Sequence, residues 1–257
     1  MRFLKKASAG LFSILFWLAI WAIASYKIDN SFIMPSPQNV IISVADLLKT
    51  SDFWIITSQS LLRILWGTVL AIILGILVAI ITTTIPFFNV LTTPLMSTVK
   101  ATPVASFIFI AIIFMNRNSL PVFITALLVL PIVWTNVSSG IKSVPKDLKE
   151  VAKIYKLNKF VQLKKLYIPT ILPYFLAACR SALGLAWKAG IAAEVLCTPK
   201  SAIGTELYFS KTYLDTEMLF AWTLITIVFS LIIEKLIILM LSKLPFKIFD
   251  SNSEVRA

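Results

Sequence analysis

Few residues in this chain could carry out covalent chemistry. The sequence contains no His, and its two cysteines, Cys179 and Cys197, are 18 residues apart in one apolar stretch. If that stretch is helical, the two residues are about 27 Å apart, too far for a disulfide or a shared metal. The seven glycines form no phosphate-binding loop of the G-x-x-x-x-G-K-[ST] type. We therefore predict no catalytic residue, no metal site and no other cofactor.

Four charged residues are unusual because they lie within or beside long apolar runs: Lys100, Arg180, Lys188 and Glu194. If these runs cross a bilayer, a charge at its centre costs roughly 2.5–3.5 kcal/mol on insertion scales, so each residue needs a partner or a role. Lys188 is halfway along its run and about 120° around a helix from Glu194, so the two are not an i, i+4 pair. We expect each to contact another helix or water.

These four residues are candidates for a path that carries a polar substrate across the membrane. Lys188 is the first choice, because a central ammonium group suits an anionic or carbonyl-rich substrate. Structural alternatives stay open for all four, and the charge of Lys188 could be neutralised entirely by protein. Arg180 is near enough to the end of its run to reach the membrane surface, and Glu194 could pair with a neighbouring helix. Lys100 precedes Thr102-Pro103, where a helix break could bring its amine to a cavity.

The composition indicates a membrane protein. Of the 257 residues, 58% are apolar and 14% charged, against roughly 45–50% and 25% in soluble proteins. The apolar residues run continuously instead of alternating, which favours helices over a transmembrane barrel. The net charge of +12 could suggest nucleic acid, but the cations lie between apolar runs and are better explained as a topology signal. We predict one all-α domain, residues 1–257, and no nucleic-acid partner.

Six transmembrane helices are expected. They fall at about residues 7–26, at two helices within 64–99 that turn near 82–89, and at about 120–140, 170–196 and 218–241. The first run also fits a signal peptide cleaved after Ala22-Ile23-Ala24. A retained anchor is favoured, since the chain continues as a multi-span protein.

The distribution of Lys and Arg predicts that both termini are cytoplasmic. With the N-terminus inside, the N-terminal tail, the 142–165 loop and the C-terminal tail carry 14 cations, and the external segments carry five. This bias follows the positive-inside rule. An external helix is expected to start at Ser36-Pro37, and with residues 201–216 it could form a platform for a binding protein or pack on the membrane surface.

Small residues recur at every fourth position in two of the expected spans. The first stripe is Gly67, Ala71, Gly75 and Ala79, and the second is Ala178, Ala182, Ala186 and Gly190. Such stripes let helices approach closely. We interpret both as packing seams within the helix bundle, with a dimer interface or a pore lining as alternatives.

The loop at residues 142–165 has the pattern of an amphipathic helix. Leu148, Val151, Ala152 and Tyr155 fall at i, i+3, i+4 and i+7, with charged residues between them. The spacing resumes at Phe160 after a short break. A loop that only fixed topology would need Lys but no apolar stripe. The pattern therefore indicates two short helices that dock on another protein or lie on anionic lipid.

The same loop resembles a family motif. Glu150-Val151-Ala152, three residues, Lys156, nine residues and then Leu166-Tyr167-Ile168-Pro169 are similar to the E-A-A, x3, G, x9, I-x-L-P motif of permease subunits of bacterial ABC importers. Other runs resemble the nitrate, sulfonate and taurine branch of that family: Met34-Pro35-Ser36-Pro37, Ser60-Leu61-Leu62-Arg63 with Gly67 and Gly75, Pro173, Arg180-Ser181-Ala182-Leu183, Ala186-Trp187, Ala193-Glu194 and Ile203-Gly204. The resemblance covers about residues 34–240.

Two departures from the family pattern stand out. The motif's Gly is Lys156 here, so the turn between the short helices lacks its most permissive residue. Asn158, which tolerates left-handed backbone conformations better than most residues, is expected to take over this turn. In addition, the Gly-containing external turn usual after the third span is replaced by Met115-Asn116-Arg117-Asn118-Ser119.

The resemblance implies a type I importer permease in the bacterial plasma membrane. It would work as a homodimer with two cytoplasmic ATPase subunits and an extracytoplasmic substrate-binding protein. Residues 142–168 would be the coupling loop, with Glu150, Val151 and Ala152 facing a groove on the ATPase and Tyr155, Lys156 and Leu157 completing the contact. The implied substrates are small anions, sulfonates and vitamin precursors. A secondary transporter driven by an ion gradient is the alternative, although it would favour paired intramembrane acids and an inverted repeat.

Overall fold

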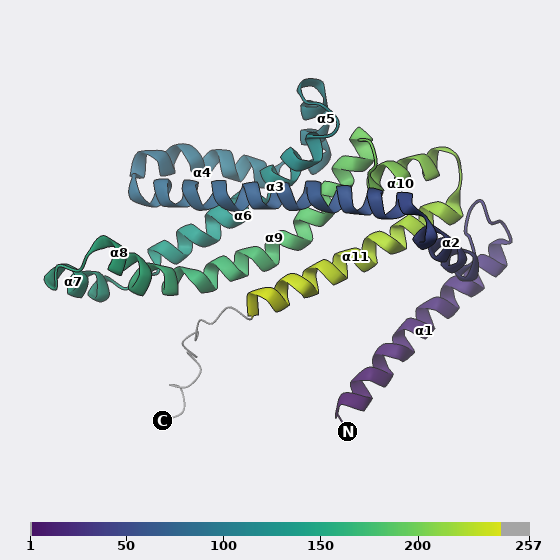
Figure 1. The fold of residues 1–257 in the computed structure, drawn as a ribbon, viewed down its shortest axis with the longest axis horizontal. Coiled ribbons are helices and arrows are strands. Elements are labelled where there is room, and N and C mark those ends of the chain that lie inside the picture. The colour runs from purple at the N-terminus through teal and green to yellow at the C-terminus, as the bar shows by residue number, and fades with distance from the viewer. Residues whose placement is uncertain (1, 243–257) are drawn as a thin grey trace. The chain divides into compact units, whose positions relative to one another are not determined.

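The computed structural model describes residues 2–242, which form helices joined by short turns (Figure 1). In chain order the helices are α1 (Arg2–Ile28), α2 (Pro37–Lys49), α3 (Ser51–Thr84), α4 (Pro86–Ala101), α5 (Val104–Phe114), α6 (Leu120–Lys142), α7 (Lys146–Ile154), α8 (Lys159–Gln162), the π-helical turn η1 (Leu163–Tyr167), α9 (Ile168–Cys197), α10 (Ile203–Thr212) and α11 (Thr216–Ser242). No strand occurs in this part of the chain, which confirms the all-α prediction. The C-terminal cations used for the topology prediction lie outside the described residues.

Six apolar helical segments occur where six spans were predicted, but they are not all alike. Among the described residues, four helices are long and apolar enough to cross a membrane: Ser51–Thr84, Leu120–Lys142, Lys159–Cys197 and Thr216–Ile237. The fifth candidate is the pair α4 and α5, which is bent by 106°. The first predicted span falls on α1, whose apolar part, Phe12–Ile28, is shorter and is not among these candidates.

The bend between α4 and α5 is the largest difference from the predicted boundaries. The chain turns at Ile85 between α3 and α4, within the predicted interval. The third span was expected to end near Val99, because Lys100 ends the charge-free run. Instead α4 continues to Ala101, the chain breaks at Thr102 and Pro103, and α5 adds eleven residues. Proline has no backbone N–H and disfavours helix in the preceding residue, which accounts for the break.

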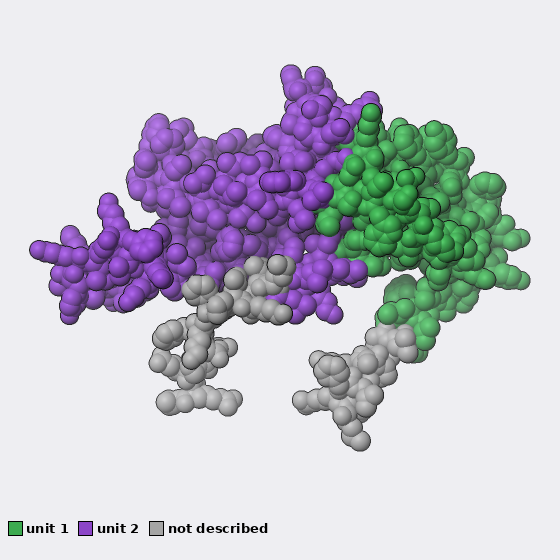
Figure 2. Space-filling view, in the orientation of Figure 1, with its two compact units in different colours: residues 1–61, 194–229 green, residues 62–193, 230–257 purple. Residues whose placement is uncertain are grey.

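The helices gather into two compact units (Figure 2). Unit 1 consists of residues 1–61 and 194–229, and unit 2 of residues 62–193 and 230–257. The long helices α3, α9 and α11 each contribute residues to both units. A single domain over residues 1–257 therefore stays a prediction.

Unit 2 is held together where α3 and α9 approach other helices closely. A Cβ added at Gly67 would lie 2.5 Å from the carbonyl oxygen of Val122 on α6, and one added at Gly190 would lie 2.5 Å from Cγ1 of Ile64 on α3. The alanines of both small-residue stripes are buried. Side chains larger than hydrogen would force these backbones apart, so the interpretation of the two stripes as packing seams is confirmed.

Unit 1 packs α1, α2 and the first third of α3 against the first part of α11. The indole N–H of Trp21 donates to the carbonyl of Pro35 at 3.1 Å, which ties α1 to the chain just before α2. Phe53 of α3 stacks on Trp222 of α11 with ring centres 5.6 Å apart. Both rings are almost fully buried, so they form the apolar core of this unit.

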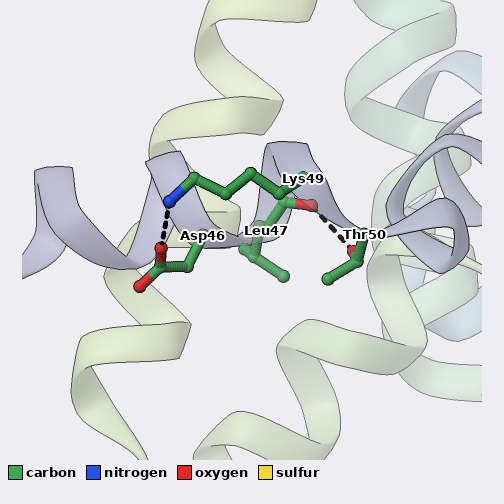
Figure 3. A network of polar contacts seen from close by, with 4 residues as sticks. All are labelled: Asp46, Leu47, Lys49 and Thr50. Atoms are coloured by element: carbon green, nitrogen blue, oxygen red, sulfur yellow. Dashed lines mark hydrogen bonds and ion pairs between the residues drawn. The ribbon is translucent and has the colours of Figure 1, made fainter.

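Helix α2 starts where the sequence predicts. Ser36 caps it by accepting a hydrogen bond from the Asn39 N–H, and Pro37 occupies the first turn. At its other end, Lys49 pairs with Asp46 at 2.8 Å and the Thr50 hydroxyl donates to the Leu47 carbonyl at 2.7 Å (Figure 3). These contacts close the last turn directly before α3. Both partners of the ion pair are exposed, so it contributes little to stability.

The packing seam predicts a position-specific effect of a single methyl group. A Cβ at position 75 would lie 2.7 Å from Cβ of Val133, so Gly75→Ala should lower the stability of the chain by about 1–3 kcal/mol through overpacking. Gly184→Ala, in α9, is the control, because no atom lies within 4 Å of its added Cβ. It should be neutral or stabilise by roughly 0.5–1 kcal/mol. Thermal unfolding midpoints in detergent measure both, and equal midpoints would contradict the seam.

Candidate functional site

The segment between α6 and α9 folds into the two short helical pieces that the amphipathic pattern predicts. In α7, Asp147 lies in the first turn and Lys153 in the last, where each charge complements the helix dipole. The short helix α8 starts at Asn158, whose side-chain oxygen accepts a hydrogen bond from the Phe160 N–H at 3.2 Å. From there η1 leads directly into α9.

Helix α7 ends in a Schellman motif built on Lys156. The Lys156 N–H donates to the carbonyl of Lys153 at 3.1 Å, and the Leu157 N–H donates to the carbonyl of Ala152 at 2.9 Å. Lys156 has a φ of 48°, the left-handed conformation that glycine adopts at least cost. The expectation that Asn158 takes over the turn is wrong: Asn158 has a φ of −58° and serves as a helix cap.

The outward surface of α7 combines apolar side chains with two acids, Asp147 and Glu150. Ile154 and Tyr155 are about three-quarters exposed and Val151 is about half exposed, and Glu150 is exposed at the edge of this surface. Ala152 is only 4% exposed, so it packs within this chain. An exposed apolar surface on a charged helix is typical of a docking site.

The loop is also fastened to the start of α9. Nζ of Lys149, on α7, lies 5.9 Å from the centre of the Tyr167 ring in η1, within the range of a cation–π contact. Lys156 and Leu157 are exposed beyond this contact. The predicted coupling residues thus lie together on one short segment. All of them are exposed except Ala152, which is buried.

Lys100 lies in the last turn of α4, directly before the bend into α5. Its Nζ donates to Oγ1 of Thr135 on α6 at 2.7 Å and lies 6.0 Å from the centre of the Trp134 ring. The indole N–H of Trp134 in turn donates to Oγ1 of Thr82 on α3 at 2.9 Å. Trp134 is buried and Lys100 is exposed. The helix break therefore places an exposed ammonium group on a fixed aromatic ring.

Arg180 and Lys188 lie on the exposed side of α9. Lys188 is two positions from both Ala186 and Gly190, and so roughly opposite the buried stripe. A Cβ added at Gly184, in the same helix, would have no atom within 4 Å. Among the described residues, neither cation forms an ion pair. Cations and small residues suit a water-filled path or a second protein surface better than hydrocarbon.

Glu194 is fully buried in unit 1. Its Oε2 accepts hydrogen bonds from Oγ of Ser60 at 2.8 Å and from the Gly204 N–H at 3.2 Å. The Ser60 Oγ also accepts from the Ile203 N–H at 2.9 Å. A Cβ at Gly204 would lie 2.4 Å from Cβ of Glu194, so only glycine fits. Glu194 thus joins α3, α9 and the start of α10. This agrees with the alternative that Glu194 pairs with a neighbouring helix. Its role in a substrate path stays a prediction.

Helix α10, on the side predicted to be external, carries an acid with a shifted pKa. Burial raises the pKa of Glu206, and the negative charge of Asp52 raises it further. An acid whose pKa is higher in the folded chain than in the unfolded chain destabilises the fold once it ionises. Unit 1 should therefore lose stability as the pH rises from the ordinary glutamate pKa through the raised one.

Comparison with known proteins identifies the family. Residues 67–240 match the family described as binding-protein-dependent transport system inner membrane component, and this match covers more than half of the chain. The chain belongs to this family. The membrane-spanning helices and the permease resemblance of the sequence are thereby confirmed, as is the type I fold expected from it.

Several similar proteins are named as permeases. The bicarbonate transport system permease protein CmpB of Synechococcus elongatus is 33% identical over 156 residues, which are 59% of this chain and 55% of the relative. The nitrate import permease protein NrtB of the same organism is 29% identical over 70% of this chain and 68% of the relative. The putative aliphatic sulfonates transport permease protein SsuC of Bacillus subtilis is 22% identical over 81% and 76%. The chain thus matches little more than half the length of the bicarbonate relative.

A solved structure shares the fold. The crystal structure of a bacterial alginate ABC transporter in complex with an alginate pentasaccharide-bound periplasmic protein superposes with a TM-score of 0.54, at 14% identity, over 92% of this chain and 93% of that one. At this identity the likeness concerns the fold alone.

The sequence did not predict which groups contact Glu194 and Lys100. Ser60 and Gly204 were noted only as parts of family-like runs, and the contact of Ser60 with Glu194 joins positions 134 residues apart. Trp134 and Thr135 carried no signal, because an aromatic and a hydroxyl residue are ordinary in an apolar helix. Their relation to Lys100 depends on how α4 packs against α6.

The Schellman motif predicts how position 156 responds to substitution. Lys156→Gly should keep the Leu157 N–H protected, because glycine adopts a positive φ without a Cβ clash. Lys156→Val should destabilise the turn by about 1–2 kcal/mol, which corresponds to roughly 5–30-fold faster exchange of that amide. Hydrogen exchange of residues 152–158 in lipid nanodiscs measures this. If the valine variant exchanges as slowly as the glycine variant, the left-handed turn is not what holds α7.

Proposed function

We propose that this chain is the membrane-spanning permease subunit of an ATP-driven importer for a small anion. Two copies would form the path, two cytoplasmic ATPase subunits would bind the α7 to η1 segment, and an extracytoplasmic binding protein would deliver the substrate. Both termini would lie in the cytoplasm. ATP hydrolysis belongs to the partner, so the chain acts by changing shape and not by covalent catalysis.

The observation that carries this proposal is the outward surface of α7. It presents Val151, Ile154 and Tyr155 with Glu150, while Ala152 anchors the helix to the chain from the other side. An amphipathic helix laid in a groove is a common mode of recognition between proteins. Lys149 on Tyr167 connects this helix to the start of α9, so a movement of the partner can be transmitted to a membrane-spanning helix.

The cations of the spans support an anionic substrate. No Asp or Glu occurs between Asp52 and Asp147, or between Glu150 and Glu194. Lys100, Arg180 and Lys188 are exposed within these stretches. Exposed ammonium and guanidinium groups without a nearby carboxylate attract anions. The relatives named for bicarbonate, nitrate and sulfonates transport ions of this kind.

The external end of unit 1 supports delivery by a binding protein. An open hollow of about 590 Å³ lies between the end of α1 and the start of α2, with Asp29, Asn30 and Gln38 in its lining. The neighbouring loop is held in place, because Thr216 Oγ1 donates to the Ser31 carbonyl at 2.6 Å and Asn39 Nδ2 donates to Glu217 Oε1 at 2.8 Å. A hollow with both polar and apolar lining beside a fixed loop is suited to receive a protein surface.

Reversing the charge of Glu150 tests the coupling role. Glu150→Lys would bury a cation without its counterpart in the partner's groove, a loss of about 2–5 kcal/mol. We expect normal membrane levels, weaker recovery of the ATPase on purification, and little ATP-dependent uptake. Lys164→Glu, an exposed charge reversal in η1, is the control and should be milder. Full recovery of the ATPase and full uptake in Glu150→Lys would reject the coupling role. Separately, uptake that needs an ion gradient but no ATP would favour a secondary transporter.

Removing Lys188 tests the anion path. Lys188→Leu should leave stability intact, since a charge is removed from membrane depth. Loss of one charge-assisted hydrogen bond, worth about 1.5–3 kcal/mol, should slow anion uptake roughly ten-fold or more. Lys235→Leu, at an exposed position of α11 outside the predicted path and docking surfaces, is the control and should transport normally. Uptake of labelled nitrate, bicarbonate and methanesulfonate by cells producing the complete importer measures this, and unchanged uptake by Lys188→Leu would exclude it from the path.

A further inference from the structure

An open hollow with a cationic rim lies at one end of unit 2. It has a volume of about 650 Å³ and is bordered by the end of α3, by α7 and by α8. The lining residues with polar groups are Thr83, Thr84, Lys149, Lys159, Gln162 and Tyr167. Two lysines and no carboxylate line the hollow, so it favours an anion. By the predicted topology this end faces the cytoplasm.

The hollow continues into an apolar groove along the membrane-spanning helices. Ile80, Ile141, Leu163 and Ile171 line both spaces, and Leu172 and Phe175 line the groove alone. The groove has a volume of about 250 Å³ and presents no polar surface. It runs between α3, α6 and α9, so it lies at the depth of the spans. Water would find no hydrogen-bond partner there, whereas a hydrocarbon chain fills such a space.

A cationic, hydroxyl-bearing mouth joined to an apolar groove matches a molecule with an anionic head and a hydrocarbon tail. We propose that this composite site binds one anionic phospholipid of the cytoplasmic leaflet. The phosphate contacts Lys149 and Lys159, with Gln162, Thr83 and Thr84 beside it. One acyl chain follows the groove past Ile171 toward Phe175.

The position of the headgroup gives this lipid a structural consequence. Lys149 belongs to α7 and Lys159 to α8, so one phosphate bridges the two short helices. Lys149 is about 200° around α7 from Val151, so a bound lipid leaves the outward surface of α7 open to a partner protein. The lipid therefore braces the loop against the spans without occupying its docking face.

Lipid retention by the full-length chain tests the site. The protein is purified from membranes, exchanged into detergent with equal phosphatidylglycerol and phosphatidylcholine, and examined by native mass spectrometry. We expect the wild type to retain one phosphatidylglycerol in preference to phosphatidylcholine. Lys149→Gln combined with Lys159→Gln should lower that retention roughly ten-fold, as expected for the loss of two charge-assisted contacts.

Matched variants separate a specific site from general attraction. Lys153→Gln combined with Lys164→Gln removes the same charge from exposed positions outside the lining and should retain the lipid within about two-fold of wild type. Ile80→Trp fills the junction of hollow and groove without changing charge, and should also lower retention. Added phosphatidylglycerol should raise the thermal midpoint of the wild type more than that of the Lys149 and Lys159 double variant, which controls for folding.

Four results would overturn the proposal. Equal retention of the two lipids would show no headgroup selectivity, and equal loss in both double variants would show only general attraction. Full retention in Ile80→Trp, with displacement of the lipid by inorganic phosphate, would show a free-anion site without an acyl groove. Normal lipid retention in the Lys149 and Lys159 variant, with loss of a co-purifying ATPase, would assign the hollow to a protein interface.

Discussion

The close approach of α3 and α9 to α6 is the contact on which unit 2 depends. In lipid, burial of apolar surface does not drive one helix against another, so association relies on van der Waals contact between closely spaced backbones. Gly67 and Gly190 converge on Thr125 of α6: added Cβ atoms would lie 2.8 Å from its Cβ and 3.0 Å from its Oγ1. Three helices thus meet at one buried residue, and a single methyl group at either glycine would separate them.

This packing also determines where the side chains of Lys188 and Lys100 lie. Because α9 turns its small-residue stripe inward, its opposite side must turn outward, and that side carries Lys188. Because α4 packs on α6, Lys100 reaches Thr135 and Trp134 at the point where α4 breaks. Among the described residues no carboxylate pairs with either cation: Lys100 contacts a hydroxyl group and an aromatic ring, and Lys188 is exposed.

The loop keeps a left-handed backbone conformation at position 156 although the glycine of the family motif is replaced by lysine. The hydrogen bonds that end α7 need a left-handed residue at position 156, and lysine adopts that conformation here. The same turn directs α8 back toward α7, which brings Lys159 and Lys149 to the rim of one hollow. A local backbone constraint thus arranges both the exposed face of α7 and the cationic rim behind it.

The sequence by itself determined the class of protein, the apolar helices, the amphipathic loop and the family. These properties follow from composition and from the spacing of residues near one another in the chain, which local geometry converts directly into faces of a helix. The structure also showed that Lys156 and not Asn158 makes the turn, and that α4 continues past Lys100 to its break at Thr102 and Pro103, both of which are local backbone features. Tertiary structure alone decided that Ala152 faces inward. It also decided that Glu194 is held by Ser60 and Gly204. These last two depend on how segments pack against one another in three dimensions, which no local pattern encodes.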